Sequence, residues 1–476
     1  MRFPNPVRFV VLAIGLLLAR LGLVAEPRVR RVTELAWPRI VTGLARMSKN
    51  AVDVAMVGIA LGGAAIAGVG FAAPYWGLAF ALGGGLAAGT IALVSQRFGA
   101  DDPEALGQAV RSSVLAVLVV TVPVSLLFYL FPRELVSIVS DDAVALAYGA
   151  DYLRIVGFGV PFAGLNLVAS RVFIGTDDAW TPMVLRASGA VANIAINAVL
   201  IFGLEMGVVG AAIGTVVSNV VVATAFAVGI VRGRLPGMGD LPVQVDPRGS
   251  YLHADVKDIV TIGAPVVGRN GVWTVAEFPM LFIVNLFGRE VVAAFVVARR
   301  IWGLMNTPGW GFGLASSSLV GQELGTGDED RAEEYGREII RFAVAVYLVS
   351  AGIVFLLAEP IVVAFLGDPT NPAVPVAVTL VYAACGAVVL QGVSGGAAGA
   401  LDTSGDTRWP FAAQAVGMFG VSIPLAYLGA TTALGLWGLY LAFLAETAVP
   451  AALNYYRFHS GAWKAVSRNY RPTPAD

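Results

Sequence analysis

A carboxylate, Asp53, lies near the middle of the apolar stretch NAVDVAMVG at residues 50–58. An ionised side chain inside a bilayer costs at least about 2.5–3.5 kcal/mol, so such a residue usually faces the protein interior and has a function. A carboxylate there can bind and release a proton or Na⁺. Lys49 stands one helical turn earlier, so a structural ion pair is the alternative role for Asp53.

Amide and hydroxyl side chains in later apolar stretches complete a candidate ion site. Asn193 and Asn197 share one helix face in NIAINAVLIFG, and Thr215 lies in GAAIGTVVSN. Their oxygens beside a carboxylate are suitable ligands for a hard cation. The pattern therefore predicts an ion-coupling site for H⁺ or Na⁺ at Asp53, Asn193, Asn197 and Thr215. Holding transmembrane helices together is the alternative role of these polar residues.

Other polar residues inside apolar stretches are secondary candidates for binding an ion or the substrate. The set is Glu277, Asn50, Lys49, Arg46, Arg269 and Arg300. Glu277 is central in GVWTVAEFPMLFIVNLFG. Arg46 and Arg269 are too far from a helix end to reach the interface, which predicts ion pairs or a water-filled cavity. A cavity lined in this way leaves anionic and zwitterionic substrates open.

The elements that position these residues are predicted to be membrane-spanning helices. The mean hydropathy is +0.77 and only 13% of residues are charged, against about 25% in soluble proteins. Apolar runs long enough to cross a bilayer recur along the chain, and about twelve of them can be separated. Such runs must be helical because lipid offers no partners for backbone polar groups. The predicted fold is an all-α polytopic membrane protein.

We expect five segments along the chain. These are an N-terminal interfacial amphipathic segment (1–33), an N-lobe of six spans (34–233), a cytoplasmic linker (234–256), a C-lobe of six spans (257–458) and a cytoplasmic tail (459–476). With both termini in the cytoplasm, the basic residues outside the spans fall on the cytoplasmic side, apart from Arg133 and Arg289. This asymmetry predicts a multi-pass protein of the cell membrane with both termini cytoplasmic.

The two halves of the chain repeat each other at a shift of about 226 to 228 residues. The matched positions are Trp76-Gly77-Leu78 with Trp302-Gly303-Leu304, Gly85 with Gly311, Gln96 with Gln322, Asp102 with Asp328, and Pro38 with Pro265. Six spans per half give both halves the same direction, so the predicted pseudo-twofold axis runs along the membrane normal. A substrate would bind between the lobes, and rocking of the lobes would expose it to alternate sides.

Composition excludes several other functions. The net charge of −1 says nothing about nucleic acid, and no basic tract indicates a nucleic-acid partner, so we expect none. Cys385 is the only cysteine, so neither an internal disulfide nor a cysteine-rich metal site is possible. The apolar stretches contain no metal-binding histidines and no nucleophile motif, so we expect no enzyme activity and no cofactor.

Taken together, the spans, the repeat and the polar motifs of the chain resemble those of the multidrug and toxic compound extrusion (MATE) family, especially the branch typified by the bacterial DNA-damage-inducible protein F. The resemblance rests on VDVAMVG (52–58), NIAINAVLIFG (193–203) and GDTRWP (405–410), and it covers about residues 34–460. It implies secondary active efflux of amphipathic, often cationic, small molecules in exchange for H⁺ or Na⁺ by alternating access. We expect a monomer in the lipid bilayer.

The resemblance also implies roles for individual positions. Asp53 matches the N-lobe acid of that branch, and Asn193 and Thr215 match its accompanying polar positions. Asn197 departs from the pattern, since many relatives have Asp there. Glu277 matches the C-lobe acid of the other prokaryotic branch, in which a further Asp stands about where this chain has Val388.

Two other transport functions remain open from the sequence. A flippase for a lipid-linked or anionic amphiphile would use the embedded arginines to hold a pyrophosphate or similar group. A channel would conduct ions without an exchange stoichiometry, and the two-lobe repeat does not favour it.

Overall fold

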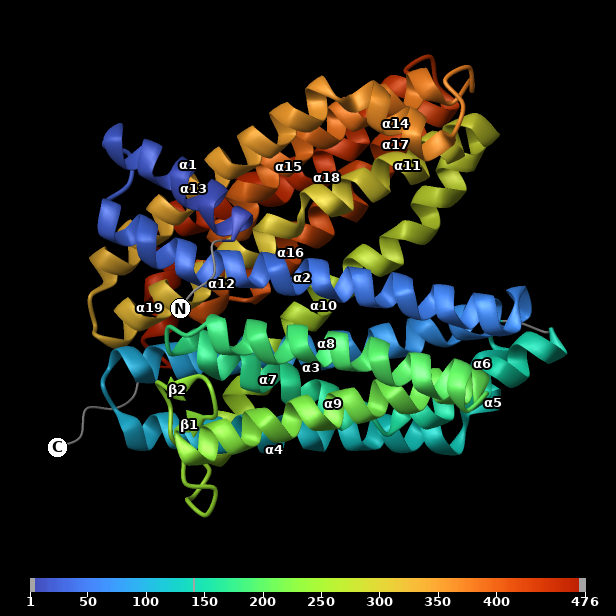
Figure 1. Ribbon diagram of the computed structural model, residues 1–476. Helices are drawn as coiled ribbons and strands as arrows, with labels where there is room; N and C mark the ends of the chain where they lie inside the picture. The colour runs from blue at the N-terminus through green and yellow to red at the C-terminus, as the bar shows by residue number, and fades with distance from the viewer. Residues whose placement is uncertain (1–4, 140–141, 471–476) are drawn as a thin grey trace. The chain divides into compact units, whose positions relative to one another are not determined.

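A computed structural model describes residues 5–139 and 142–470, which form two compact units (Figure 1). The N-lobe unit comprises Val41–Val267, and the C-lobe unit comprises the residues up to Ile40 together with those from Gly268 onward. The outermost parts of the predicted N-terminal segment and tail, residues 1–4 and 471–476, lie outside the described residues.

The N-lobe unit is helical except for one short hairpin. It contains α2 (Glu26–Leu61) after Ile40, α3 (Gly63–Gly99), α4 (Pro103–Leu130), α5 (Pro132–Ser137), α6 (Ala143–Gly157), α7 (Val160–Gly175), α8 (Trp180–Ala198), the π-helix η1 (Val199–Gly203), α9 (Gly207–Arg232), β1 (Arg234–Leu235), β2 (Gly239–Asp240) and α10 (His253–Leu286) before Gly268. The antiparallel β1–β2 hairpin, with Leu235 opposite Gly239, lies in the predicted cytoplasmic linker.

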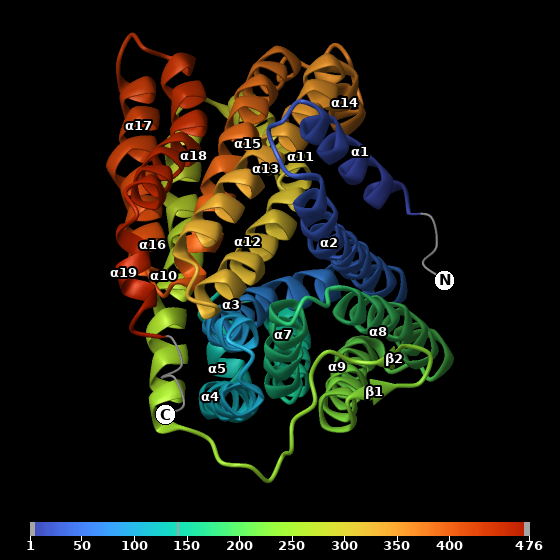
Figure 2. The same ribbon diagram turned by 90° about the vertical axis from the view of Figure 1, so that its left-hand side faces the viewer.

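The C-lobe unit is built in the same way. It contains α1 (Pro6–Arg20), the first part of α2, the rest of α10, α11 (Arg289–Met305), α12 (Thr307–Gly325), α13 (Glu329–Leu356), α14 (Ala358–Leu366), α15 (Val374–Thr403), α16 (Arg408–Ala415), the π-helix η2 (Val416–Ser422), α17 (Ile423–Thr431), α18 (Leu436–His459) and α19 (Ala462–Ser467). Helices α12, α13 and α15 pack against one another (Figure 2).

The lengths of these helices confirm the predicted class of all-α polytopic membrane protein. In the described part of the chain, eight helices are long and apolar enough to span a membrane, or nine if the bent pair α6–α7 is one span. This pair bends by 51°, where Gly157, Gly159 and Pro161 follow one another closely. The other three predicted spans, α2, α10 and α11–α12, carry more charged residues, including most of the candidate site residues.

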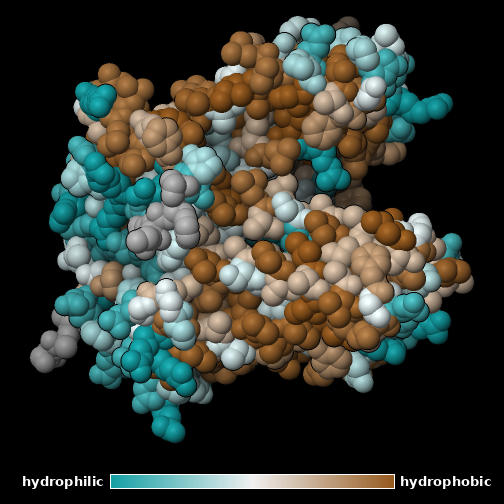
Figure 3. All heavy atoms as spheres, viewed as in Figure 1, coloured by the Kyte–Doolittle hydropathy of each residue, from teal (hydrophilic) through white to brown (hydrophobic). Residues whose placement is uncertain are grey.

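The outer face of the N-lobe unit suits a lipid environment. Val191 on α8 is 68% exposed, and Val221 on α9 is 55% exposed. Figure 3 shows apolar residues along the face over α8 and α9, with polar residues gathered near the β1–β2 hairpin. In water, an apolar face this large would be a liability, whereas hydrocarbon solvates it without penalty.

The boundary between the units differs from the predicted lobe boundaries, because it lies inside two helices. It falls between Ile40 and Val41 in α2, and between Val267 and Gly268 in α10. The residues before each boundary therefore pack within the opposite half of the repeat. Pro38 and Pro265, which match in the repeat, each stand just before the boundary. Proline removes a helical hydrogen bond and weakens the helix at these points.

Two segments, the start of α2 and the start of α10, are thus exchanged between the halves of the repeat, and matching glycines contact them closely. In the N-lobe unit, a Cβ atom on Gly85 would lie 2.6 Å from the carbonyl oxygen of Gly263 in α10. In the C-lobe unit, a Cβ atom on Gly311 would lie 2.6 Å from the carbonyl oxygen of Ala36 in α2. Gly85 and Gly311 are partners in the sequence repeat, so the repeat preserves a close backbone contact in both halves.

The N-terminal helix α1 packs on the C-lobe unit. Gly15 of α1 faces Val29 and Phe342, which leaves no room for a side chain at that position. Phe9 and Leu17 are 72% and 57% exposed on the other side of the helix. Helix α2 begins at Glu26, before the predicted first span at residue 34.

Candidate functional site

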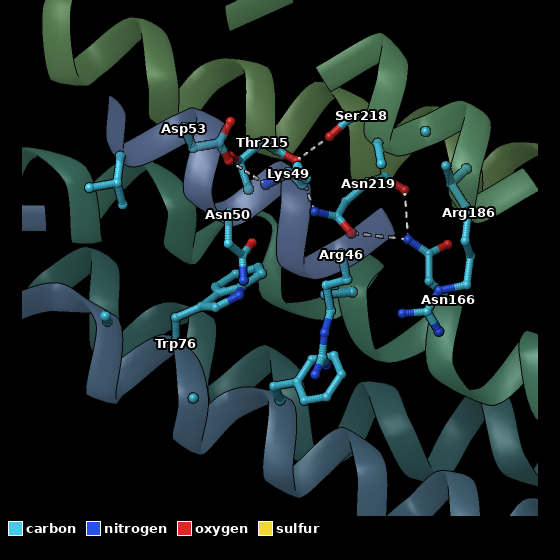
Figure 4. A pocket seen from close by; sticks show the side chains of 18 of the residues that line it. Arg46, Lys49, Asn50, Asp53, Trp76, Asn166, Arg186, Thr215, Ser218 and Asn219 are labelled. Atoms are coloured by element: carbon cyan, nitrogen blue, oxygen red, sulfur yellow. Dashed lines mark hydrogen bonds and ion pairs between the residues drawn. The ribbon is translucent and has the colours of Figure 1, made fainter. Parts of the chain in front are cut away.

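The N-lobe unit contains a pocket of about 530 Å³ lined by α2, α3, α6, α7, α8 and α9. Its polar lining residues are Thr42, Arg46, Lys49, Asn50, Asp53, Tyr152, Asn166, Arg186, Thr215, Ser218 and Asn219. Its larger apolar lining residues are Val54, Val69, Trp76, Phe80 and Val222. Figure 4 shows the polar side chains gathered around this pocket.

Asp53 lies on the pocket wall and is bonded on both sides. One carboxylate oxygen is 2.6 Å from Lys49 Nζ, and the other accepts a hydrogen bond of 2.9 Å from Asn197 Nδ2. The side chains of Asp53 and Lys49 are each 18% exposed. The structure therefore contains the expected structural ion pair, and at the same time leaves the carboxylate beside the pocket.

The predicted polar partners of Asp53 form a connected network behind it. Asn197 Nδ2 also donates to Asn193 Oδ1 at 3.3 Å, and Asn193 Nδ2 donates to Thr215 Oγ1 at 3.5 Å and Ser218 Oγ at 3.3 Å. Asn193 and Asn197 are fully buried. The four residues of the predicted ion-coupling site thus lie together in the structure.

Local sequence explains how this network is positioned. Asp178 accepts a hydrogen bond of 2.9 Å from the Thr181 backbone, which caps the start of α8. At its other end, α8 continues into the π-helix η1 just after Asn197. Gly214 lies against Asn197 Oδ1, where a Cβ atom would overlap the amide. A glycine there lets α9 approach α8 closely enough for Thr215 to reach Asn193.

The candidate oxygens fit a proton better than Na⁺ in this arrangement. Both Asp53 oxygens face hydrogen-bond donors, because the Lys49 ammonium and the Asn197 amide N–H point at them. Asn197 Oδ1 is a buried oxygen with no hydrogen-bond partner, but it faces Gly214. Na⁺ requires several convergent oxygens, so it would have to displace the Lys49 ammonium.

Residues of one α2 face extend the site away from Asp53. Arg46, Lys49, Asn50 and Asp53 stand at positions i, i+3, i+4 and i+7, which places them on one face of the helix. The Arg46 guanidinium lies 4.9 Å from the ring centroid of Phe80. Asn50 and Arg46 therefore line the pocket, with Arg46 two turns away from Asp53 (Figure 4).

Several residues that line the pocket were not among the predicted site residues, and three of them extend its polar lining on α6, α7 and α8. Arg186 on α8 and Asn166 on α7 line the pocket, and Asn166 Nδ2 donates to Asn219 Oδ1 at 3.1 Å. Tyr152 lines it from α6. Arg186 carried a usable signal, because it is a charged residue inside a predicted span, as Arg46 is. Arg186 was not assigned to the same site as Asp53 because the two residues are far apart in the sequence.

None of the candidates in the second half is among the described residues that line this pocket. Arg269 forms a two-pronged ion pair with Asp402, with distances of 3.1 and 2.7 Å. Glu277 and Arg300 are exposed and form no ion pair within the described residues. These placements give Arg269 a structural partner and bring neither Glu277 nor Arg300 into a polar cluster.

A different ion pair is enclosed in the C-lobe unit. Arg299 contacts both carboxylate oxygens of Glu446, at 2.6 and 2.7 Å, and Glu446 is fully buried. The rings of Phe295 and Phe443 flank the guanidinium at 5.0 and 4.8 Å. A bidentate pair of this kind is geometrically fixed, which suits a structural role.

A sequence model of the MatE family matches residues 38–199 and 265–428. Among curated proteins, "Probable multidrug resistance protein YoeA" of Bacillus subtilis (strain 168) is 24% identical over 441 residues, covering 90% of this chain and 92% of that protein. "Probable multidrug resistance protein NorM" of Bradyrhizobium diazoefficiens is 27% identical over 447 residues, covering 91% and 93% of the two chains.

Solved structures show the same fold. A MATE crystal structure carrying a proline-to-alanine mutation superimposes with a TM-score of 0.84 at 23% identity, covering 94% of this chain and 98% of the other. A MOP superfamily transporter from Pyrococcus furiosus Vc1, described as having a binding pocket of reverse polarity, gives a TM-score of 0.83 at 22% identity and covers 93% and 97%. This likeness confirms the predicted fold of twelve helices in two lobes.

The two matched segments correspond to the two halves of the internal repeat and together cover more than half of the chain. The relatives are transport proteins, which confirms that the chain is a transporter rather than an enzyme. The chain belongs to the MatE family.

Proposed function

We propose that this protein exports amphipathic small molecules across the cell membrane in exchange for H⁺ or Na⁺, with Asp53 as the coupling group. The observation that carries the proposal is the position of Asp53, the only carboxylate among the described residues that line the pocket. The multidrug resistance names of the relatives support this class of substrate.

The contacts of Asp53 suggest how coupling works. While Asp53 is ionised, it holds Lys49 at 2.6 Å and the Asn197 amide at 2.9 Å. Protonation removes the charge that attracts Lys49 and frees this side chain within the pocket. If the two access states hold this ion pair with different strength, the coupling ion shifts the equilibrium between them. The donors around Asp53 favour H⁺ over Na⁺ as that ion.

The size of the pocket favours small molecules over a lipid-linked oligosaccharide. Sites for drug-sized ligands measure about 300–1,000 Å³, and this pocket of about 530 Å³ falls within that range. The C-lobe arginines that could hold a pyrophosphate do not line this pocket, because Arg269 is paired with Asp402 and Arg300 is exposed elsewhere. Small-molecule exchange is therefore the function supported best.

The proposed orientation in the membrane rests on the sequence. The distribution of arginine and lysine favours both termini in the cytoplasm. We propose a monomer, since the pocket is formed within one unit of one chain. Accessibility labelling of single cysteines introduced near each terminus would test the orientation, and the mass of the purified protein in detergent would test the monomer.

The transport proposal is tested in proteoliposomes under imposed gradients. Wild-type protein should move a fluorescent amphipathic dye when a pH gradient or a Na⁺ gradient is applied separately, and one of the two gradients should suffice. Asp53→Asn keeps the shape of the side chain and should abolish gradient-driven movement. Asp151→Asn, which changes an exposed acid on α6, serves as the matched control and should transport normally. Full gradient-driven transport by Asp53→Asn would reject the role of Asp53.

A further inference from the structure

The pocket carries more positive than negative charge. Among its described lining residues, Arg46, Lys49 and Arg186 are basic, and Asp53 is the only acid. Asp53 is already engaged by Lys49. Arg186 therefore contributes a positive charge that no carboxylate of the described pocket lining offsets.

Among the described residues, Arg186 stands without a counter-ion. No carboxylate of the described residues forms an ion pair with it, although its side chain is only partly exposed. Arg171 on α7 and Arg46 on α2 act on it by like-charge repulsion. Three arginines from three helices thus face one region of the N-lobe unit. Charged side chains within membrane-spanning helices are normally paired or belong to a binding pathway, so Arg186, which has no ionic partner among the described residues, is suited to bind an anion.

The arginine cluster is separate from the coupling group. Arg46 precedes Asp53 by two helical turns, which is about 10 Å along α2 at about 1.5 Å per residue. Arg186 precedes Asn197 by about three turns on α8, or about 16 Å by the same geometry. Asp53 and Asn197 are in contact, so the arginines lie together at the other end of the same pocket (Figure 4).

Apolar side chains line the pocket beside the two arginines. Phe80 stacks under the Arg46 guanidinium at 4.9 Å, and Trp76 lies one turn from Phe80 on α3. A ligand that matches this lining has a compact anionic group and an aromatic or aliphatic body. Guanidinium groups bind carboxylate, sulfonate and phosphate oxygens through two parallel hydrogen bonds.

We propose that the N-lobe pocket binds the anionic headgroup of a small amphiphile between Arg186 and Arg46, with the apolar body of the ligand against Trp76 and Phe80. The inference rests on the proposed function, because it identifies the pocket as the substrate site. It replaces the expected cationic substrate by an anionic one. The substrate and the coupling ion then occupy different groups, so exchange depends on the two access states rather than on competition for Asp53.

Equilibrium binding to the purified full-length protein tests the inference. The probes are 8-anilino-1-naphthalenesulfonate and N-phenyl-1-naphthylamine, which share one ring system and differ by the sulfonate. Arg186→Gln should weaken binding of the sulfonate at least about tenfold while leaving the uncharged probe within about twofold. Arg154→Gln, on an exposed arginine of α6, is the matched control and should leave both probes unchanged. Arg186→Lys keeps the charge and should retain intermediate affinity.

The outcomes separate this inference from the proposed function. Equal binding of the sulfonate to wild type and Arg186→Gln, or an equal loss for both probes, would overturn the anionic subsite. Tighter binding of tetraphenylphosphonium than of the sulfonate by wild type would overturn it as well. In Asp53→Asn, sulfonate binding should persist while gradient-driven transport is lost. Sulfonate binding through Arg186 without any gradient-driven transport in wild type would contradict the proposed function and leave the subsite intact.

Discussion

The ion pair between Arg97 and Asp255 fastens the exchanged start of α10 to the N-lobe unit, and its removal should destabilise that unit strongly. Arg97 Nη1 and Nη2 lie 2.7 and 2.5 Å from the Asp255 oxygens, and Nη1 also donates to the Ala105 carbonyl at 2.9 Å. The side chains are only 8% and 3% exposed. Replacing Asp255 with leucine would therefore leave a buried guanidinium without its counter-charge.

The expected loss of folding free energy follows from two opposing contributions. At 2.7 Å and an effective dielectric constant of about 20, the attraction between Arg97 and Asp255 is about 6 kcal/mol. Desolvation of the two ions costs several kcal/mol each and offsets most of this attraction. Removing one partner loses the attraction and leaves the other desolvated, so Asp255→Leu should cost about 3–5 kcal/mol. Arg97→Met combined with Asp255→Leu should cost less than either single change.

The assay is equilibrium unfolding in mixed micelles, followed by tryptophan fluorescence, for both single variants and the double variant. An exposed pair of similar length provides the control. Arg30 and Glu26 lie 2.8 Å apart but are 59% and 57% exposed, so Glu26→Gln should change stability by less than about 0.5 kcal/mol. Strictly additive losses in the double variant, or losses as small as that of Glu26→Gln, would refute this account of the α10 attachment.

Three further predictions concern other parts of the chain. Gly89→Val should lower the thermal unfolding midpoint because its side chain would overlap the α10 backbone, whereas Gly84→Val, with nothing within 4 Å, should leave it unchanged. Glu277→Gln should keep coupled transport within about twofold of wild type, since the exposed Glu277 lies outside the pocket; a loss as complete as that of Asp53→Asn would contradict this. A hydrogen bond from Lys464 of α19 lowers the pKa of Glu333 in α13 from its usual value of 4.5. Docking of α19 on α13 should therefore be fully stable above pH 4.5 and weaken as the pH falls through the lowered pKa of Glu333. Tryptophan fluorescence that stays unchanged on acidification to about pH 2 would contradict this.

Much of the fold could be predicted from the sequence because hydrophobic length alone dictates membrane helices. The exchange of the α2 and α10 segments could not, because both segments belong to continuous helices whose packing partners are distant in sequence. The matched glycines Gly85 and Gly311 held the relevant signal. Their partners Gly263 and Ala36 are distant in sequence, so the close contacts depend on tertiary packing that the sequence pattern does not specify.

The candidate site was predictable where neighbours share a helix face. Lys49 and Asp53 are four residues apart on α2, and the ion pair follows from this spacing. Helix α8 approaches α2 and brings Asn197 to Asp53, so these two members of the predicted polar set are in contact. Arg186 was missed because its relation to Arg46 depends on how two helices lie side by side, which no local pattern specifies.

The central claim, that Asp53 carries the coupling ion, is tested most directly by following ion flux when substrate is added. Proteoliposomes loaded with a pH-sensitive dye should report proton movement on addition of a transported amphiphile to wild type and to Asp151→Asn. With Asp53→Asn, no proton movement should follow, although the amphiphile still binds. Substrate-induced proton flux of wild-type size in Asp53→Asn would contradict the account.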